Sequence, residues 1–407
     1  MKKLVSLILA IMMIAAVGAA FATSMDLAND GVDGSKTNTT TNTSVTIYKE
    51  LTAFNPSATT INAPTISYSY AISGDVTIAD SATITDSDSI AVKPYAGSTA
   101  NSVTPSITSS VGWTPAETLT ASSTGAANKK PLTVSFTGTF PRAGVYRYLI
   151  TETITDAAYT AAGVVNGTIS NTRYLDVYVK DENVIYGYVL TDANNTATSS
   201  STTKTEGFVA TTGDDALTAD QYHTFNLTIS KTVSNDNYIK TTHHQFPFTV
   251  TFTNATVTGA VKPIVTATTN ATLAQADAAA IASFTATAPT IADGASVTYT
   301  GIPMGTVVSI VEQNNVTGTT YAVTTTGADT NISTAEAVTS GNSTTGTIAI
   351  TAQTAGSEAD KTVAVTNDMQ IISPTGYVSR VAPYALILVG GIFLLIIATR
   401  RKNTAEE

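Results

Sequence analysis

The sequence predicts an all-β protein built from two tandem β-sandwiches of immunoglobulin-like type. Three observations support this prediction. Thr, Ser, Ala, Val and Asn abound while charged residues make up only 12% of the chain, a composition that suits strands joined by short polar turns. Short segments of alternating apolar and polar residues recur along the chain, separated by Gly, Pro, Asn and Asp. These segments fall into two similar cycles, and a length of 407 residues accommodates two or three domains.

The N-terminal end has the pattern of a secretory signal peptide. Two lysines precede an apolar run over residues 4–17, and the small residues at 20–22 fit a cleavage site. We therefore expect residues 1–22 to be removed on export. Residues 23–43 are rich in Asp, Gly, Asn and Thr and show no periodicity, so we expect a flexible leader there.

The first β-sandwich is expected over residues 44–225. Alternating patterns and a Pro-Arg-Ala-Gly turn define most of its strands, whereas residues 74–130 hold Ser- and Thr-rich loops with weak strand patterns. The expected strands are Ser44–Leu51, Ile66–Ile72, Leu132–Phe136, Val145–Glu152, Tyr174–Val179 and Val184–Leu190, the last two forming a hairpin.

The second β-sandwich is expected over residues 226–370. An Ala-rich piece at 272–281 is its one segment of helical character. Its expected strands are Leu227–Lys231, Phe246–Phe252, Val297–Tyr299, Thr306–Glu312, Tyr321–Thr326, Thr345–Ile350 and Thr362–Asn367. Both cycles open on an alternating strand that ends in lysine, Lys49 or Lys231, and both contain a later strand that ends in glutamate, Glu152 or Glu312.

This repeated pairing of lysine and glutamate suggests a covalent chemistry. An inward-pointing lysine is costly as a cation, and burial of a neighbouring glutamate favours its neutral form. A neutral amine is a nucleophile, and a neutral carboxyl can polarise an Asn or Asp side chain and carry a proton to the leaving group. The expected product is an amide, with loss of ammonia or water. It would supply a cross-link to a secreted chain that has no cysteines.

The C-terminal end, residues 371–407, combines a short motif with an apolar segment. The motif is Pro374-Thr375-Gly376, the apolar segment at 384–399 is expected to be a transmembrane helix, and a basic cluster follows it. Because such clusters stay in the cytoplasm, the rest of the chain is expected to lie outside. The simpler interpretation is a membrane anchor.

The same C-terminal end resembles a sortase sorting signal of Gram-positive surface proteins. The usual motif of that family is Leu-Pro-any-Thr-Gly, whereas here Pro374 directly precedes Thr375, as in some streptococcal-type backbone pilins. The resemblance implies cleavage between Thr375 and Gly376 and transfer of the Thr375 carboxyl to an amine. Which sortase would recognise the variant motif stays open.

A second resemblance covers most of the mature chain. The phrases Leu-Thr-Ile-Ser-Lys at 227–231, Phe-Pro-Phe-Thr-Val at 246–250, Val-Glu at 311–312 and Val-Thr-Asn at 365–367 resemble the isopeptide-linked, CnaB-type domains of streptococcal-type major pilins. That family joins a lysine to an asparagine beside a catalytic glutamate. The resemblance implies a second-domain bond of Lys231 with Asn367, assisted by Glu312. For the first domain it implies Lys49 with Asp220 or, alternatively, Asn226, assisted by Glu152.

A pilin of this kind also needs a lysine that accepts the next subunit. Lys204 is the favoured candidate because of its place before the last strand of the first domain, and Lys180 is the alternative. The implied partners are a sortase, neighbouring pilin subunits, cell-wall peptidoglycan and a host surface ligand, for a protein secreted and anchored at the cell wall. The alternative function is a monomeric wall-anchored adhesin, which would not use an internal lysine.

Composition and motifs argue against other functions. A formal net charge of -10 does not suit nucleic-acid binding. We expect no cofactor and no enzyme activity beyond one self-modification in each domain, because no nucleotide loop or hydrolase site is present in the sequence. We also expect no metal centre, because the histidine and aspartate pairs lack the spacing of known sites: His243 with His244, Asp30 with Asp33, and Asp86 with Asp88.

Overall fold

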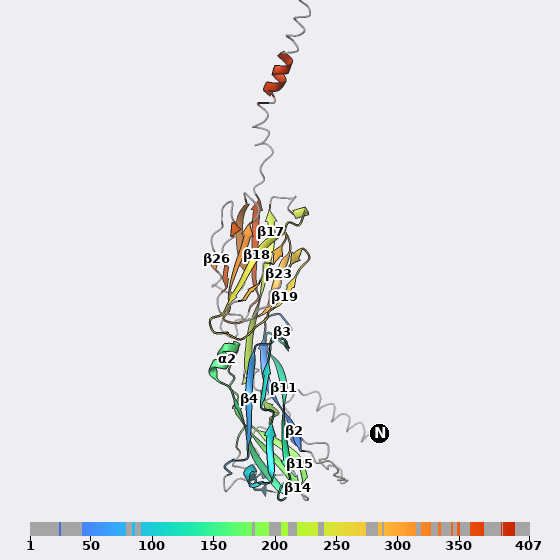
Figure 1. Cartoon of the computed structure of the whole chain (residues 1–407), viewed down its shortest axis with the longest axis vertical. Helices are drawn as coiled ribbons and strands as arrows, with labels where there is room; N and C mark the ends of the chain where they lie inside the picture. Colours follow the sequence, from blue (N-terminus) through green and yellow to red (C-terminus); the bar gives the residue numbers. More distant parts are fainter. Residues whose placement is uncertain are drawn as a thin grey trace, which may run out of the picture.

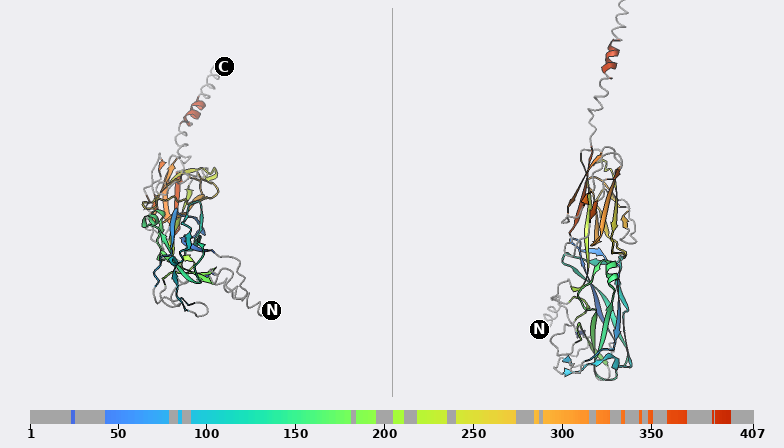
Figure 2. Two further views of the ribbon diagram at one scale, coloured as in Figure 1. Left: turned by 60° about the horizontal axis from the view of Figure 1, so that its bottom comes forward. Right: turned by 90° about the vertical axis from the view of Figure 1, so that its left-hand side faces the viewer.

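The computed structural model is an elongated molecule in which two β-sandwiches lie end to end (Figure 1). The turned views in Figure 2 show the same end-to-end arrangement. The tandem β-sandwich fold predicted from the sequence is therefore confirmed. The structure describes residues 24–25, 43–78, 84–85, 91–180, 184–194, 205–210, 218–234, 240–273, 284–286, 289–314, 319–326, 333–334, 343–344, 348–350, 359–369, 384 and 386–394.

The N-terminal sandwich consists of two facing sheets. The first contains, in spatial order, β15 (Val184–Thr191), β14 (Thr172–Lys180), β12 (Gly144–Thr153), β4 (Ile66–Ser73) and β9 (Ser110–Trp113). The second contains β17 (Asp220–Ser234), β2 (Ser44–Phe54), β11 (Ala126–Gly138) and β8 (Val103–Ile107). Shorter strands complete the domain, including β3 (Thr60–Asn62), β10 (Thr118–Thr120), β7 (Tyr95–Ala96) and β16 (Gly207–Phe208).

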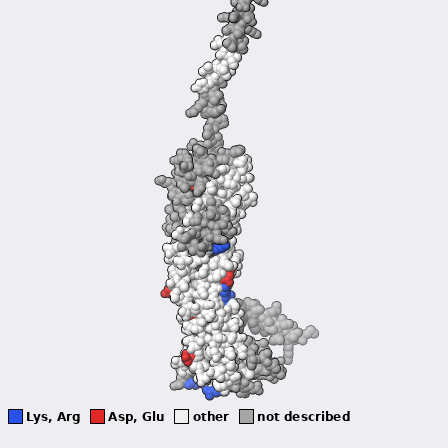
Figure 3. All heavy atoms as spheres, in the orientation of Figure 1, with Lys and Arg blue, Asp and Glu red and all other residues white. Residues whose placement is uncertain are grey.

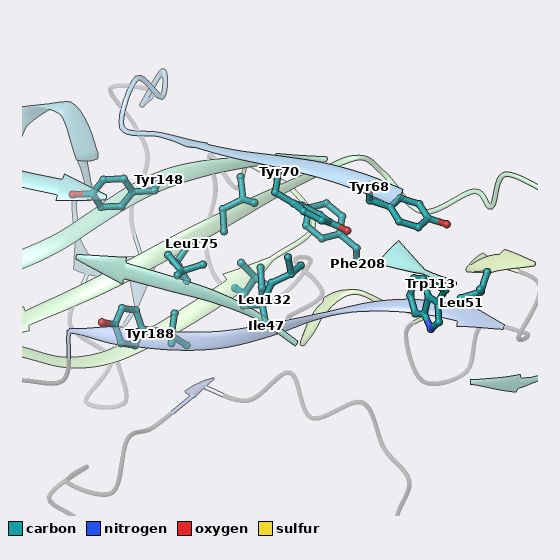
Figure 4. Packing of buried hydrophobic residues seen from close by; sticks show 14 of the residues in the cluster. Ile47, Leu51, Tyr68, Tyr70, Trp113, Leu132, Tyr148, Leu175, Tyr188 and Phe208 are labelled. Carbon is teal, nitrogen blue, oxygen red and sulfur yellow. The ribbon is translucent and has the colours of Figure 1, made fainter. Parts of the chain in front are cut away.

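The core of this domain is rich in aromatic side chains. Along β4 the side chains of Ile66, Tyr68 and Tyr70 are buried and those between them are exposed, as the two-residue period of a strand requires. Figure 4 shows Tyr68 and Tyr70 on one sheet and Ile47 and Leu51 on the facing strand. Burial of such large apolar surfaces is the main stabilising contribution in a chain without disulfides.

A short helix that the sequence patterns did not predict lies beside this sandwich. Helix α2 (Asp156–Ala162) begins where the Thr155 side chain accepts a hydrogen bond from the amide of Ala158, and it ends at Gly163, which has the left-handed φ of 69° that favours glycine. Strand β13 (Val164–Val165) then pairs with β17. Helix α2 and its following loop are thereby held against the last strand of the domain.

The C-terminal sandwich repeats the two-sheet arrangement. One sheet contains β19 (Ile264–Ala267), β23 (Ser296–Pro303), β17, β29 (Lys361–Met369) and β25 (Thr319–Thr326). The other contains β22 (Thr290–Ile291), β18 (Phe246–Thr253), β24 (Val307–Asn314), β28 (Ile348–Ile350) and β26 (Ser333–Thr334), with β20 (Ala271–Thr272), β21 (Phe284–Ala286) and β27 (Ser343–Thr344) paired beside them. Its core is a separate apolar cluster between the sheets.

Strand β17 connects the two domains without interruption. Residues 220–223 pair with β2 of the first domain, and residues 224–230 pair with β23 of the second. At the junction, Asn55 and Asn226 exchange two side-chain hydrogen bonds of 2.9 and 2.8 Å. Asn226 also donates to Ser57 and Asp360, so one buried amide joins groups of both domains.

The two ends of the chain are described only in part. Ser24 and Met25, in the expected leader, form β1 and pair with β15, whereas residues 1–22 and the motif at 374–376 lie outside the described residues. Residues 386–394 are helical with exposed apolar side chains. Within the described part of the chain, no helix is long and apolar enough to cross a membrane. Of the expected helix at 272–281, Thr272 belongs to β20 and residues 274–281 lie outside the described residues.

Candidate functional site

The two lysine–glutamate pairs singled out in the sequence lie in equivalent places in the two sandwiches. In the first domain Lys49 lies on β2 and Asp220 on the neighbouring β17, while Glu152 projects from β12 in the facing sheet. We call Lys49, Glu152 and Asp220 the first trio. All three side chains are buried, at relative exposures of 3%, 5% and 5%. The first trio therefore connects both sheets through the core.

The first trio is in direct contact. The Nζ atom of Lys49 lies 2.9 Å from Oε1 of Glu152 and 2.8 Å from Oδ2 of Asp220. One ammonium group thus faces two carboxylates away from water, where charge interactions are much stronger than at the surface. Of the two acceptors considered from the sequence, the structure brings Asp220 to Lys49. Asn226 lies instead at the domain junction, hydrogen-bonded to Asn55.

Strand register explains this contact. Strands β2 and β17 run parallel, and Asp220 lies opposite Leu51, two residues after Lys49. Side chains alternate between the two faces of a sheet, so Lys49 and Leu51 share one face. Asp220, opposite Leu51 on the neighbouring strand, lies on the same face. The side chains of Lys49 and Asp220 therefore both point into the core.

Tyrosines surround the first trio. The ring of Tyr68 lies 4.2 Å from Lys49 Nζ, in the geometry of a cation–π interaction. The Tyr70 hydroxyl donates a 2.6 Å hydrogen bond to Oε2 of Glu152, and the Tyr159 hydroxyl donates a 3.0 Å hydrogen bond to Oδ2 of Asp220. Burial raises the pKa of all three tyrosines, with a further contribution from the nearby carboxylates, so their hydroxyls stay protonated and those of Tyr70 and Tyr159 act as donors.

The second domain contains a corresponding set, Lys231, Glu312 and Asn367, which we call the second trio. Lys231 lies on β17 and Asn367 on the parallel β29, while Glu312 comes from β24 of the facing sheet. Their relative exposures are 1%, 1% and 0%. Asn367 Nδ2 donates a 2.7 Å hydrogen bond to Oε1 of Glu312, and Lys231 Nζ lies 3.2 Å from Oε2 of the same carboxyl.

Burial shifts the titration of the second trio toward neutral forms. Desolvation lowers the pKa of Lys231 to about 8, although the attraction of Glu312 opposes this shift. Desolvation likewise raises the pKa of Glu312. Within the described residues, Lys231 Nζ and Asn367 Oδ1 have no hydrogen-bond partner. The amine is therefore the kind of poorly solvated nucleophile that attacks carbonyl groups.

The two trios share one register. Asn367 lies opposite Val233, two residues after Lys231, just as Asp220 lies opposite Leu51, two residues after Lys49. The aromatic neighbours also correspond. Glu312 lies opposite Phe248 and Glu152 opposite Tyr70. The ring of Phe246 lies 4.5 Å from Lys231 Nζ, in the place that Tyr68 occupies at Lys49.

The geometry suits amide formation between side chains. Each trio holds an amine, a carboxyl able to transfer protons, and an acceptor carbonyl within a buried, largely aromatic surrounding. No group of three or more His, Asp or Glu side chains suited to a metal is present among the described residues.

The remaining predicted residues are described less completely. Lys180 is the last residue of β14, paired with Val184, and its side chain lies outside the described part. Lys204 and the segment Pro374-Thr375-Gly376 also lie outside the described residues. The structure therefore brings the six residues of the two trios together, and the acceptor lysine and sorting motif stay predictions.

Sequence reasoning did not identify four groups that contact the first trio. Tyr68 and Tyr70 could have been found, because they alternate along the strand expected at 66–72 and so share the inward face. Tyr159 lies on the unexpected helix α2, and Gly167 contributes only its backbone amide, which donates a 2.9 Å hydrogen bond to Oδ1 of Asp220. Neither of these last two carries a sequence pattern that points to the trio.

Comparisons with known proteins give the following similarities. Residues 225–369 match a family described as a domain of unknown function, DUF7601. No curated protein sequence matches the chain at a significant level. Among solved structures, the chain is similar to the major pilin of Streptococcus pyogenes, at 15% identity and a TM-score of 0.37, over 80% of this chain and 98% of the pilin.

Two of the other similar structures are a second major pilin and a pilus adhesin. A major pilin (T-13) from Streptococcus pyogenes is 17% identical, with a TM-score of 0.35, over 80% of this chain and 99% of the pilin. A pilus-presented adhesin is 19% identical, with a TM-score of 0.26, over 48% of this chain and 37% of the adhesin. Similarity at this level transfers no function to this chain.

Proposed function

We propose that each sandwich cross-links itself through an amide bond, between Lys49 and Asp220 in the first domain and between Lys231 and Asn367 in the second. The observation that carries this proposal is the contact of a buried lysine with both a buried glutamate and an acceptor in the first trio, at 2.9 and 2.8 Å. The second trio supports the proposal because its lysine and acceptor have the same strand register as those of the first trio. Unrelated charged residues on strands would not be expected to repeat this register.

The second-domain reaction balances without any external reagent. A proton passes from Lys231 to Glu312, and the neutral amine then attacks Cγ of Asn367. Through Glu312, Nδ2 receives the two protons that were on the ammonium group of Lys231, so that a C–N bond forms, the Cγ–Nδ2 bond breaks and the nitrogen leaves as ammonium, which lowers the mass of the chain by one ammonia. The first-domain reaction follows the same course, except that an oxygen of Asp220 departs as water. Glu152 and Glu312 are regenerated in each case.

The test is the intact mass of a chain covering residues 23–375, compared with Glu152→Ala and Glu312→Ala. The proposal expects the wild-type mass to be lower than the sequence mass by one water and one ammonia. Glu152→Ala should restore the water and Glu312→Ala the ammonia. Two ammonias lost would instead point to Asn226 as the first acceptor, and an unchanged wild-type mass would contradict self-cross-linking altogether.

We further propose that the chain is the backbone subunit of a covalent surface pilus assembled by a sortase. The signal-like N-terminus, the Pro374-Thr375-Gly376 motif and the apolar segment before a basic tail support export and sorting. Thr375 would be joined to an internal lysine of the next subunit, Lys204 or, alternatively, Lys180, and finally to peptidoglycan. Internal cross-links suit this role because subunits in such a fibre bear tension.

Cell-wall extracts test this second proposal. High-mass ladders that vanish on Lys204→Ala or Lys180→Ala would support the pilus and identify the acceptor lysine. Thr375→Ala should abolish both the ladder and the wall linkage. A single wall-linked species that neither lysine substitution changes would contradict polymerisation and favour the monomeric wall-anchored adhesin.

A further inference from the structure

The acceptor of the first trio is held by the segment that contains helix α2, strand β13 and the loop after β13. Helix α2 places the Tyr159 hydroxyl 3.0 Å from Oδ2 of Asp220, and the following loop places the Gly167 amide 2.9 Å from Oδ1. Each oxygen of the Asp220 carboxylate therefore has its own donor. Lys49 Nζ contacts only one of them, Oδ2, at 2.8 Å among the contacts described.

We propose that Tyr159 and the backbone amide of Gly167 are catalytic groups for the first-domain bond, and that they make an aspartate a competent acceptor there. This inference rests on the proposed self-cross-linking. The Gly167 amide stabilises the oxygen that stays as the amide carbonyl, in the manner of an oxyanion hole. The Tyr159 hydroxyl holds the oxygen that leaves as water.

The contacts distinguish the roles of Oδ1 and Oδ2 of Asp220 in the reaction. Lys49 transfers a proton to Glu152, and its neutral nitrogen attacks Cγ of Asp220 while negative charge gathers on Oδ1 at the Gly167 amide. Oδ2 lies beside Lys49 and Tyr159, so it receives the two protons that were on the ammonium group, one of them through Glu152. The C–N bond forms, the Cγ–Oδ2 bond breaks, water leaves and Glu152 is again a carboxylate. No external reagent is consumed.

An aspartate needs such donors more than an asparagine does. A carboxylate carries a negative charge that repels a nucleophile and spreads over both oxygens, whereas a carboxamide is neutral. Two hydrogen bonds that neutralise this charge in a buried site are worth far more than they would be in water. Across the described residues of the second domain, by contrast, Oδ1 of Asn367 has no hydrogen-bond partner. The segment that supplies Tyr159 and Gly167 thus occurs in the domain whose acceptor, Asp220, is the less reactive one.

The segment is built so that these donors stay in place. Amides of Thr168 and Ile169 donate to the carbonyl oxygen of Thr218, which anchors the loop to the chain just before Asp220. A side chain at Gly167 would overlap that same carbonyl oxygen, so only glycine allows the close approach. The Tyr159 ring packs edge-to-face on Tyr68 with 6.1 Å between ring centroids, which fixes its hydroxyl toward the trio.

The test follows bond formation over time in full-length chain made by cell-free synthesis. Trypsin digestion and mass spectrometry measure the branched peptides that contain the Lys49–Asp220 and Lys231–Asn367 bonds. Tyr159→Phe removes the hydroxyl and keeps the ring, and it should slow the first bond by about ten- to a hundredfold. The second bond, in the same molecules, should form at the wild-type rate. Tyr148→Phe is the matched control, because its buried hydroxyl has no hydrogen-bond partner among the described residues.

A second comparison separates chemistry from loosened packing. The effect of Tyr159→Phe is measured again in an Asp220→Asn background, where ammonia leaves in place of water. The inference expects a clearly smaller slowing there, because the neutral amide depends less on the donor. Equal slowing with both acceptors, or a wild-type rate in Tyr159→Phe, would overturn the role of Tyr159. Absence of the Lys49–Asp220 peptide in the wild-type chain would instead contradict the proposed function itself.

Discussion

Asp220 and Lys231 lie on the same unbroken strand, β17, yet they belong to the trios of different domains. Asp220 faces Lys49 on β2, and Lys231 faces the acceptor strand β29. With both proposed bonds in place, the Lys49–Asp220 bond would connect β2 to β17. The Lys231–Asn367 bond would connect β17 to β29, so that a covalent path would join the three strands. Tension along the chain would then bypass the residues between each pair of linked side chains.

Single-molecule stretching tests this path. A wild-type chain pulled from its two ends is expected to show no unfolding step for either domain, because the linked residues cannot separate. Glu312→Ala should leave Lys231 and Asn367 unlinked and so release residues 231–367, which adds roughly 45 nm of contour length at 3.3–3.6 Å per residue. An unfolding step of that size in the wild-type chain would contradict the second bond.

The hydroxyl of Tyr70 is expected to contribute to stability, unlike that of Tyr148. Tyr70 donates a 2.6 Å hydrogen bond to Oε2 of the buried Glu152, so Tyr70→Phe leaves a carboxylate oxygen without this donor. We expect the free energy of unfolding to fall by about 1–3 kcal/mol. Tyr148→Phe should change it little, since the Tyr148 hydroxyl has no partner within the described residues.

Urea denaturation of both variants, after mass spectrometry has shown equal cross-linking, measures this difference. Equal losses of stability in Tyr70→Phe and Tyr148→Phe would show that the hydrogen bond to Glu152 contributes nothing of its own.

The sequence predicts the fold class and the two lysine–glutamate pairs for a definite physical reason. Strands are recognised in a sequence by the alternation of apolar and polar residues. A lysine or glutamate within such a pattern is rare in a chain with 12% charged residues. Among the described residues on the face seen in Figure 3, charged side chains are few and scattered. The acceptors Asp220 and Asn367 lie opposite Leu51 and Val233 because of the register of the paired strands. A strand pattern in the sequence does not determine this register.

Other parts of the site could not be predicted in this way. Helix α2 covers only residues 156–162, too short for a helical period to be recognised, so Tyr159 was missed. Gly167 acts through its backbone amide, which leaves no side-chain signal. The domain boundary expected at 225/226 falls inside β17, because a strand shared by two sheets has no turn residues to mark it.

The pKa of Lys231 predicts a pH-dependent stability of the unlinked second domain. Asn367→Ala removes the acceptor and leaves Lys231 buried near Glu312 and Asp293, with a pKa lowered from 10.5 to about 8 by burial. Between these two values the unfolded chain binds a proton that the folded chain does not, so stability rises with pH. Below pH 8 both states are protonated and this contribution is constant. The expected gain from pH 8 to above 10.5 is about 3 kcal/mol.

Urea denaturation of Asn367→Ala across this pH range measures the gain. The matched control adds Lys231→Met, which keeps an apolar stem and removes the amine, and this double variant should lack the rise. Parallel stability curves for the two variants would show that Lys231 titrates normally in the folded domain.

The amide of Asn226 is expected to keep the two domains in line. It exchanges hydrogen bonds with Asn55 of the first domain, and it accepts from the amide of Gly301 and donates to Asp360 in the second, at 3.1 and 2.8 Å. Asn226→Ala would leave several of these buried groups without their partner, at a cost of about 1–3 kcal/mol. Because the lost contacts span the junction, the unfolding transitions of the two domains should also separate.

Calorimetry and small-angle X-ray scattering test this prediction together. Asn226→Ala should show two resolved transitions and a broader distribution of molecular dimensions than the wild-type chain. Thr65→Val is the control, since it removes an exposed hydrogen bond of 2.9 Å to the carbonyl oxygen of Ala260 across the same junction and should have a much smaller effect. Similar behaviour of the two variants would mean that alignment depends on the continuity of β17 and not on the buried amide network.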